Sequence, residues 1–170
     1  MATKWILDPT HSEITFKVKH MMISNVKGSF RTFTAEIDSE DEFFANAKTT
    51  ATIQTDSVFT NNTDRDNHLK SAEFFNAEVH PTITFESQAL NNSIVGNLTI
   101  NGITKPVNLD VDFGGINVDP WGNTKAGFSF EGKISRKDFG LNWNAALEAG
   151  GVMVSEEVKI AGELQFVKQA

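Results

Sequence analysis

An alternating stretch near the start of the chain constrains the fold most strongly. Pro9 and Thr10 form a turn, and from residue 13 to residue 20 apolar and polar side chains then alternate without a break. A strict period of two with one apolar row predicts a half-buried β-strand. Its inner row is Ile14, Phe16, Val18 and His20. The histidine that ends this row is either a core residue hydrogen-bonded to backbone or a polar group at the rim of a cavity.

The same period of two recurs along the chain and predicts one antiparallel β domain over residues 1–170. Alternating rows occupy 33–37, 49–55, 82–89, 94–100, 107–113, about 125–138 and 157–167. Asn101-Gly102 joins two of these rows and is the strongest short signal for a hairpin. Gly114-Gly115 and residues 119–123 are expected to form a longer loop. The pattern indicates roughly eight strands in all.

Residues 64–75 depart from this period and form the one stretch that predicts a helix, with Thr63 or Asp64 at its N-cap. Asp64, Asp66 and His68 carry metal-ligand atoms at a spacing of two. Helix residues two positions apart do not share a face, however. A capped helix that ties down a loop is therefore favoured over a metal site.

Composition excludes several classes of function. The chain has 15 Lys and Arg against 22 Asp and Glu, a formal charge of −7, which argues against a nucleic-acid partner. It has no cysteine, so disulfides, thiolate catalysis and Cys-ligated zinc are excluded. Its first ten residues carry no apolar signal-peptide core. No apolar run approaches the ~18 residues of a membrane span. We therefore expect a soluble, cytoplasmic protein.

The longest predicted strand, about 125–138, bears on what the interior holds. At ~3.3 Å per residue it extends to roughly 40 Å, so a barrel of such strands would be tall. A tall tube lined by Phe, Ile, Val and Leu suits a long apolar molecule. Without a bulge, Arg136 and Asp138 continue the inward row that reaches Ile134. Two interpretations stay open: a pocket for a lipid with a polar head, or an Arg136–Asp138 pair that plugs the barrel end or anchors a loop.

Five short motifs follow one another along essentially the whole chain. They are Asp8-x-x-His11-Ser12-x-Ile14-x-Phe16-x-Val18-x-His20, Arg65-Asp66-x-His68-Leu69-x-Ser71-x-Glu73-Phe74-Phe75, Pro81-x-Ile83-x-Phe85, Gly96-Asn97-Leu98-Thr99-Ile100-Asn101-Gly102-Ile103-Thr104-Lys105-Pro106-Val107, and Ser135-Arg136-Lys137-Asp138-Phe139-Gly140-Leu141. In this order they resemble the YceI-like family, polyisoprenoid-binding proteins with a lipocalin-like barrel. The resemblance implies an all-β, eight-stranded antiparallel lipocalin-like barrel with one short helix and an elongated apolar cavity. Many relatives are periplasmic and carry signal peptides, and this chain departs from them.

The resemblance and the inward rows together give a candidate binding site inside the barrel. We assign the cavity wall to Ile14, Phe16, Val18, Phe85, Leu98, Leu109, Phe128, Phe130, Ile134, Phe139 and Trp143. We assign the polar mouth to His20, Arg65, Asp66, His68, Arg136 and Asp138. No catalytic or metal-ligating residue is assigned. The expected ligand is an isoprenoid or another long-chain lipid, and no cofactor is required.

This site predicts a non-enzymatic protein that binds an amphiphilic isoprenoid, such as a prenyl quinone or a polyprenyl phosphate, for transport or storage. One alternative is an enzyme that acts on a lipid head group through His20, Arg136 and Asp138. Another is a filled barrel that serves as a protein-interaction module. Besides the lipid, the sequence leaves two further associations open. They are transient contact with a membrane surface and formation of a homodimer.

Asp8, His11 and Ser12 are the residue types of a serine triad. Adjacency in sequence is not triad geometry, and the chain has no Gly-x-Ser-x-Gly elbow. Hydrogen bonds at the start of the first long strand are the favoured role for these side chains.

Overall fold

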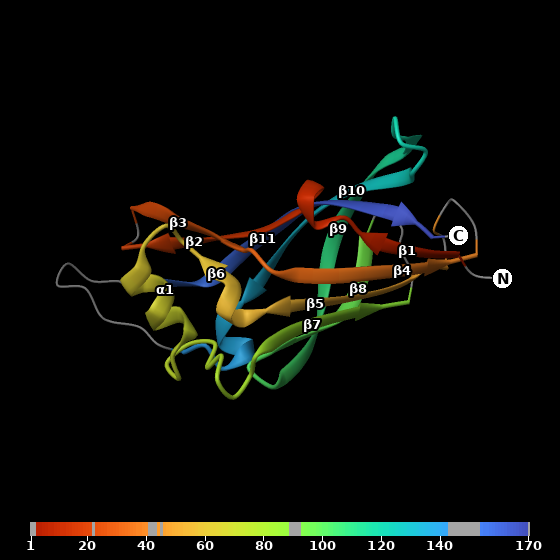
Figure 1. Cartoon of the computed structure of the whole chain (residues 1–170). Helices are drawn as coiled ribbons and strands as arrows, with labels where there is room; N and C mark the ends of the chain where they lie inside the picture. Colours follow the sequence, from red (N-terminus) through yellow and green to blue (C-terminus); the bar gives the residue numbers. More distant parts are fainter. Residues whose placement is uncertain are drawn as a thin grey trace.

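The computed structural model of the chain describes residues 3–21, 23–40, 44, 46–88, 93–142 and 154–169. Its strands are β1 (Thr3–Leu7), β2 (Glu13–His20), β3 (Ser24–Phe30), β4 (Phe33–Ser39), β5 (Lys48–Gln54), β6 (Val58–Phe59), β7 (Thr82–Ser87), β8 (Ser93–Ile100), β9 (Ile103–Val118), β10 (Thr124–Ser135) and β11 (Val154–Lys168). Its helices are α1 (Thr63–Lys70) and the short 3-10 helices η1 (Pro9–His11), η2 (Thr55–Ser57) and η3 (Arg136–Phe139). Figure 1 shows the strands wrapped around one interior, with α1 at the end that also holds the tips of β2 and β3.

The eleven strand segments make eight passes of the chain around a closed barrel. β1 and β2 are one pass interrupted by η1, β3 and β4 are one pass broken by a bend, and β5 and β6 are one pass interrupted by η2. The order around the barrel is β1-β4-β5-β7-β8-β9-β10-β11, and β11 returns to pair with β1 and β2. Every pairing is antiparallel. The structure confirms the predicted eight-stranded antiparallel barrel. It also confirms the predicted single helix, since α1 is the one α-helix among the described residues.

The long strand β9 shows one confirmed prediction and one correction. Asn101 and Gly102 form the predicted two-residue turn before it, with positive φ angles of 56° and 74° that suit a type I′ hairpin. A loop was predicted at Gly114 and Gly115, but β9 continues through both as a strand. The register shifts there opposite Gly127, so the two glycines accommodate a β-bulge instead of ending the strand.

The structure also corrects the end of β10. This strand stops at Ser135, and residues 136–139 turn as η3, which Gly140 closes in the left-handed conformation at φ 73°. A 3-10 turn repeats every three residues, so the inward row of the strand does not continue to Arg136 and Asp138. The prediction that the strand runs to Asp138 is therefore wrong.

The helix is shorter than predicted and begins one residue earlier. Its N-cap is Asn62, whose side chain accepts a hydrogen bond from the N–H of Arg65 at 3.0 Å. It ends at Lys70 because Ser71 donates both its N–H, at 3.1 Å, and its hydroxyl to the carbonyl of His68. This side-chain bond competes with further helical turns. Residues 71–79 then form turns.

An aromatic cluster closes the barrel end that lies away from α1. Phe44 is at its centre, with ring centroids 5.3 Å from Trp5, 5.5 Å from Phe113 and 5.1 Å from Phe128. Phe128 also meets Phe166 at 5.9 Å. Trp5 and Phe44 are each only 1% exposed, so side chains seal this end of the interior.

Candidate functional site

The barrel interior is an elongated apolar cavity made of two adjoining hollows. The mouth hollow, of 410 Å³, lies beside α1, and the inner hollow, of 150 Å³, lies deeper in the barrel. Both hollows are lined by Phe16, Phe30, Ile83, Ile100, Ile134 and Ile160. These shared residues lie at the boundary between the two hollows. The elongated apolar cavity expected from the sequence is therefore present.

Most of the predicted wall residues line this cavity. They are Ile14, Phe16, Val18, Phe85, Leu98, Leu109, Phe128, Phe130 and Ile134. Phe139 is only 1% exposed and belongs to the hydrophobic core, but it lines neither hollow, because it lies in η3 and not on a strand. Trp143 lies outside the described residues.

Several wall residues were not predicted. Phe30 lines both hollows and lies in the same period-two row of β3 as Val26, so its signal was available in the sequence. Phe74 and Phe75 also line the mouth hollow, but they come from turns after α1. The sequence placed both on the buried side of a helix that was expected to reach residue 75, but the helix ends at Lys70 and these residues reach the hollow from turns.

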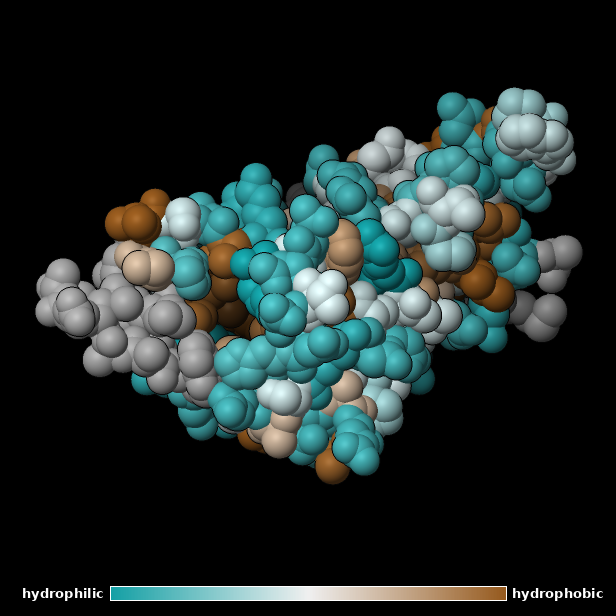
Figure 2. All heavy atoms as spheres, turned by 60° about the vertical axis from the view of Figure 1, so that its left-hand side comes forward, coloured by the Kyte–Doolittle hydropathy of each residue, from teal (hydrophilic) through white to brown (hydrophobic). Residues whose placement is uncertain are grey.

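Polar side chains gather at the rim of the mouth hollow. They are Lys19 and His20 from β2, Asp64, Arg65 and His68 from α1, and Arg136 from η3. On the face seen in Figure 2, hydrophobic atoms show inside a hollow that hydrophilic residues border on its right-hand side. Lys19 and Arg65 are cations and Asp64 is a carboxylate, so with the buried Arg136 behind them the rim has an excess of positive charge and favours an anionic or strongly polar group.

Two side chains of α1 fix the helix to the end of β6. Asp66, 9% exposed, accepts hydrogen bonds from the Thr60 N–H at 2.8 Å and from the Thr60 hydroxyl. Arg65 donates from Nε to Thr60 Oγ1 at 2.8 Å and from Nη2 to the Thr60 carbonyl at 2.6 Å. His68 Nε2 lies 2.9 Å from the carboxylate of Glu73. The predicted mouth residue Asp66 therefore lies behind the rim and holds the helix, whereas Arg65 and His68 line the rim.

Arg136 has the geometry of a loop anchor. Its side chain is buried and donates from Nε to the Ser155 carbonyl at 2.8 Å, from Nη1 to the Leu141 carbonyl at 2.6 Å, and from Nη2 to the Val154 carbonyl at 3.1 Å. Burial lowers the pKa of Arg136 below its usual value, and the charge of Glu156 opposes this shift. These bonds join η3 to the first residues of β11. Asp138 is exposed and lines neither hollow, so the structure does not bring it to the predicted mouth.

The residues that resembled a triad form a strand-anchoring cluster instead. Asp8 accepts hydrogen bonds from Lys125 Nζ at 2.9 Å and Thr10 Oγ1 at 2.7 Å, and its carboxylate lies 2.9 Å from His11 Nδ1. Ser12 donates its hydroxyl to the Asp8 carbonyl at 2.7 Å, away from the His11 ring. No nucleophile–base pair is formed, because the Ser12 hydroxyl is bonded to backbone.

The side chains of α1 with metal-ligand atoms do not converge. Asp66 turns to Thr60 and His68 turns to Glu73. Within the described ranges, no three His, Cys, Asp or Glu side chains come together as a metal site. No helix in this part of the chain is long and apolar enough to cross a membrane.

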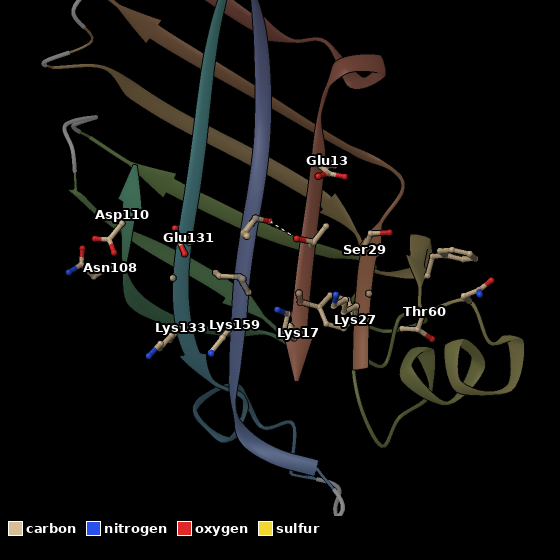
Figure 3. A pocket seen from close by; sticks show the side chains of 18 residues that line it. Glu13, Lys17, Lys27, Ser29, Thr60, Asn108, Asp110, Glu131, Lys133 and Lys159 are labelled. Carbon is tan, nitrogen blue, oxygen red and sulfur yellow. Dashed lines mark hydrogen bonds between the residues drawn. The ribbon is translucent and has the colours of Figure 1, made fainter. Parts of the chain in front are cut away.

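A second, larger hollow lies on the outer surface of the barrel. This outer groove, of 900 Å³, is an open depression on β9, β10, β11, β2 and β3, and Figure 3 shows charged side chains along it. Lys17 lines it, whereas the neighbouring residue Val18 lines the cavity, because successive strand residues face opposite sides. The groove has a charged lining and is unsuited to an apolar chain.

Comparisons with known proteins agree with this geometry. A model of the YceI-like domain matches residues 5–166. A UPF0312 protein of Staphylococcus epidermidis is 43% identical over 166 residues, covering 96% of this chain and 97% of that protein. The crystal structure of BcnA from Burkholderia cenocepacia has the same fold, with a TM-score of 0.79, 22% identity, and coverage of 94% of this chain and 98% of BcnA. A polyisoprenoid-binding domain from Saccharophagus degradans shares the fold with a TM-score of 0.72, 14% identity, and coverage of 97% and 98%.

Proposed function

This chain belongs to the YceI-like family, and we propose that it binds an amphiphilic isoprenoid lipid, such as a prenyl quinone or a polyprenyl phosphate, for transport or storage. The observation that carries the proposal is the elongated apolar cavity, which aromatic side chains close at one end and polar side chains border at the other. The fold that it shares with the S. degradans domain, which is named for polyisoprenoid binding, supports this ligand class.

The driving force for binding is hydrophobic transfer of the prenyl chain. Each CH₂ removed from water contributes about 0.8 kcal/mol. Since binding also immobilises the ligand, only part of this free energy becomes affinity, and a partly buried prenyl tail suffices for a dissociation constant of micromolar order. The mouth hollow, at 410 Å³, has the size of ordinary ligand pockets. Chains longer than the cavity would extend past the rim.

The head group is expected at the rim, beside Lys19, His20 and Arg65. A lysine and an arginine there favour a phosphate or a polarised quinone carbonyl over a neutral alcohol. Arg65 already donates to Thr60, so it contributes charge and its remaining donor positions.

The arrangement supports a binding role over an enzymatic one. Among the residues considered for head-group chemistry, Arg136 bonds to three backbone carbonyls and Asp138 is exposed away from the cavity. His20 and Arg136 line the same hollow, but the Arg136 guanidinium is engaged by these carbonyls and Asp138 does not line the hollow, so the three do not form a catalytic set. A filled barrel acting as an interaction module is disfavoured by the open hollows in its interior.

The test is native mass spectrometry of freshly purified protein, followed by organic extraction and titration of the emptied protein with a prenyl quinone, a prenyl alcohol and a prenyl phosphate. We expect bound or readily acquired lipid. Ile134→Trp, at the boundary between the hollows, should weaken uptake strongly. Its control is Val95→Trp, because Val95 is 66% exposed on the barrel surface. Protein that excludes every prenyl compound would refute the proposal, and an altered lipid head group after incubation would show an enzyme.

A further inference from the structure

The β2–β3 hairpin concentrates positive charge in a negatively charged protein. Residues 14–35 contain Lys17, Lys19, Lys27 and Arg31 but no Asp or Glu, although the whole chain has a formal charge of −7. A segregation of this kind creates a local positive potential on one side of the molecule. It occurs beside the mouth hollow, whose rim includes His20 at the end of β2.

Four lysines stand directly opposite one another across four neighbouring strands. Lys133 of β10 pairs with Lys159 of β11, Lys159 with Lys17 of β2, and Lys17 with Lys27 of β3. We call these four residues the lysine row, and Figure 3 shows them side by side along the outer groove.

Like charges at directly opposed strand positions destabilise a sheet. Lys133 lies 3.7 Å from the Glu157 carboxylate. Among the described residues, Lys17, Lys27 and Lys159 form no ion pair. The carboxylates of the groove, such as Glu131, lie further from the mouth along the same strands. The repulsion within the lysine row would be relieved by an anionic partner.

The tip of the same hairpin is apolar and exposed. Met21 and Ile23 follow His20 and are 42% and 83% exposed. Lys27 comes four residues after Ile23, or ~13 Å along an extended strand. An exposed apolar tip with lysines set behind it is the arrangement of proteins that insert into the surface of an anionic bilayer.

We propose that this tip and the lysine row form a docking surface for an anionic lipid bilayer, which brings the mouth hollow to the membrane. A tip inserted about 5–10 Å into the interface leaves Lys17 and Lys27 within one Debye length, about 10 Å, of the charged surface. The role of docking in loading the cavity rests on the proposed function. Adsorption to the bilayer itself does not.

Another exposed apolar tip lacks the charge for this role. The turn between β9 and β10 carries Trp121 at 83% exposure and Val118 at 59%. The neighbouring carboxylate of Asp119 accepts hydrogen bonds from the N–H groups of Asn123 and Trp121, each at 2.9 Å, and these hold its pKa below the usual value. The cation beside it, Lys125 at 3.8 Å, is also paired with Asp8, so this turn offers an anionic surface no excess of positive charge. This turn lies at the end away from α1 (Figure 1).

The experiment is vesicle flotation of lipid-free protein. Vesicles of phosphatidylcholine alone are compared with vesicles of equal parts phosphatidylcholine and phosphatidylglycerol. We expect salt-sensitive binding to the anionic vesicles only. Lys17→Gln with Lys27→Gln should weaken it about fivefold for each lysine removed. Ile23→Ser should also weaken it, because the apolar anchor is lost. The matched controls are Lys4→Gln with Lys48→Gln, which change the net charge equally at the far end, and Trp121→Ser.

The outcomes separate docking from ligand binding. Weaker flotation of the hairpin variants, with unchanged uptake of a prenyl alcohol in solution, supports the docking surface. Equal losses in the Lys4 and Lys48 control would show a net-charge effect only and would overturn it. Absence of flotation would also overturn it. A dimer of the wild-type protein that the lysine variants disrupt would overturn it too, because the surface would then bind a second copy of the chain. Intact flotation without uptake would refute the proposed function and leave docking standing.

Discussion

The ring of Phe16 lies on Gly28, its directly paired residue on the neighbouring strand. A Cβ at Gly28 would clash with the ring, so only glycine lets the ring lie flat against the barrel wall. Phe130 lies in the same way on Gly162, its paired residue on β11. Both rings face inward, and both would narrow the cavity if they stood away from the wall. These two pairs therefore line the interior with aromatic side chains and still leave space at its centre.

The first prediction is that Gly28→Ala narrows the cavity. The new methyl group would push the Phe16 ring from the wall into the cavity, where the two hollows adjoin. We expect weaker binding of prenyl chains and a loss of about 1–3 kcal/mol in the free energy of unfolding. Ligand titration and urea unfolding measure the two effects. Gly127→Ala is the control, because a Cβ there meets nothing within 4 Å. Unchanged binding by Gly28→Ala would contradict this prediction, because the Phe16 ring would then have moved without narrowing the cavity.

The second prediction concerns chain length. Phe130 lines the inner hollow, so Phe130→Trp should shorten the space available to the ligand tail. Short prenyl alcohols should bind as before. The affinity for long ones should fall by about tenfold or more, since added side-chain volume in a tightly packed wall costs roughly 1–3 kcal/mol. Ser129→Trp, on the outward row of the same strand, is the control. An equal loss for every chain length would indicate general destabilisation instead.

The third prediction separates the structural role of Arg136 from a role in head-group recognition. Arg136→Met removes hydrogen bonds to the carbonyls of Leu141, Val154 and Ser155 in a buried site. We expect a loss of about 3 kcal/mol or more in unfolding free energy, because each bond from a charged donor contributes roughly 1.5–3 kcal/mol. The neighbouring variant Lys137→Met removes only the exposed ion pair with Glu156 and should change the stability far less. A stable Arg136→Met protein that binds prenyl phosphate poorly would contradict the anchor role.

The fourth prediction is a dependence of stability on pH through Asp8. The hydrogen bond from Lys125, then those from Thr10 and His11, hold the pKa of Asp8 well below its usual value. The lowered pKa means that ionised Asp8 stabilises the fold above the unfolded-state pKa of about 3.9. This contribution is lost as the pH falls through the folded-state pKa.

Asp8→Asn should therefore lower the unfolding free energy at neutral pH by about 1–3 kcal/mol, and the difference from wild type should shrink in strong acid. Urea unfolding across the acid range measures it. Lys125→Gln should overlap with Asp8→Asn in a double-mutant cycle, because the two side chains are hydrogen-bonded. A difference that persists undiminished in acid would exclude ionisation of Asp8 as its source.

The period of two was enough to predict the inward rows. Ile14, Phe16 and Val18 line the cavity as the alternation indicates, and His20 reaches its rim. The alternation is reliable here because adjacent strand residues must face opposite sides, and only one side of this barrel is apolar. The Asn101-Gly102 turn was equally predictable, since two positive φ angles suit few other dipeptides.

The sequence pattern failed where the backbone leaves the strand. Arg136 and Asp138 were expected in one inward row, but the 3-10 turn buries Arg136 against backbone carbonyls and leaves Asp138 exposed. The mouth residues that come from α1 were found through motif resemblance, and their hydrogen bonds to Thr60 and Glu73 were not predictable. Such bonds depend on how the helix sits against β6, which no local period encodes.

By itself, the sequence determined which side chains face the interior, because facing depends only on alternation along each strand. It could not determine which residues become neighbours across strands. The tertiary structure decided that Phe16 lies on Gly28 and that Lys17 stands between Lys159 and Lys27. These pairings follow from register, which the hairpins, the bulges and the closure of β11 onto β1 and β2 set together. The physical reason is that a one-residue slip changes every cross-strand pair without changing the sequence pattern of any single strand.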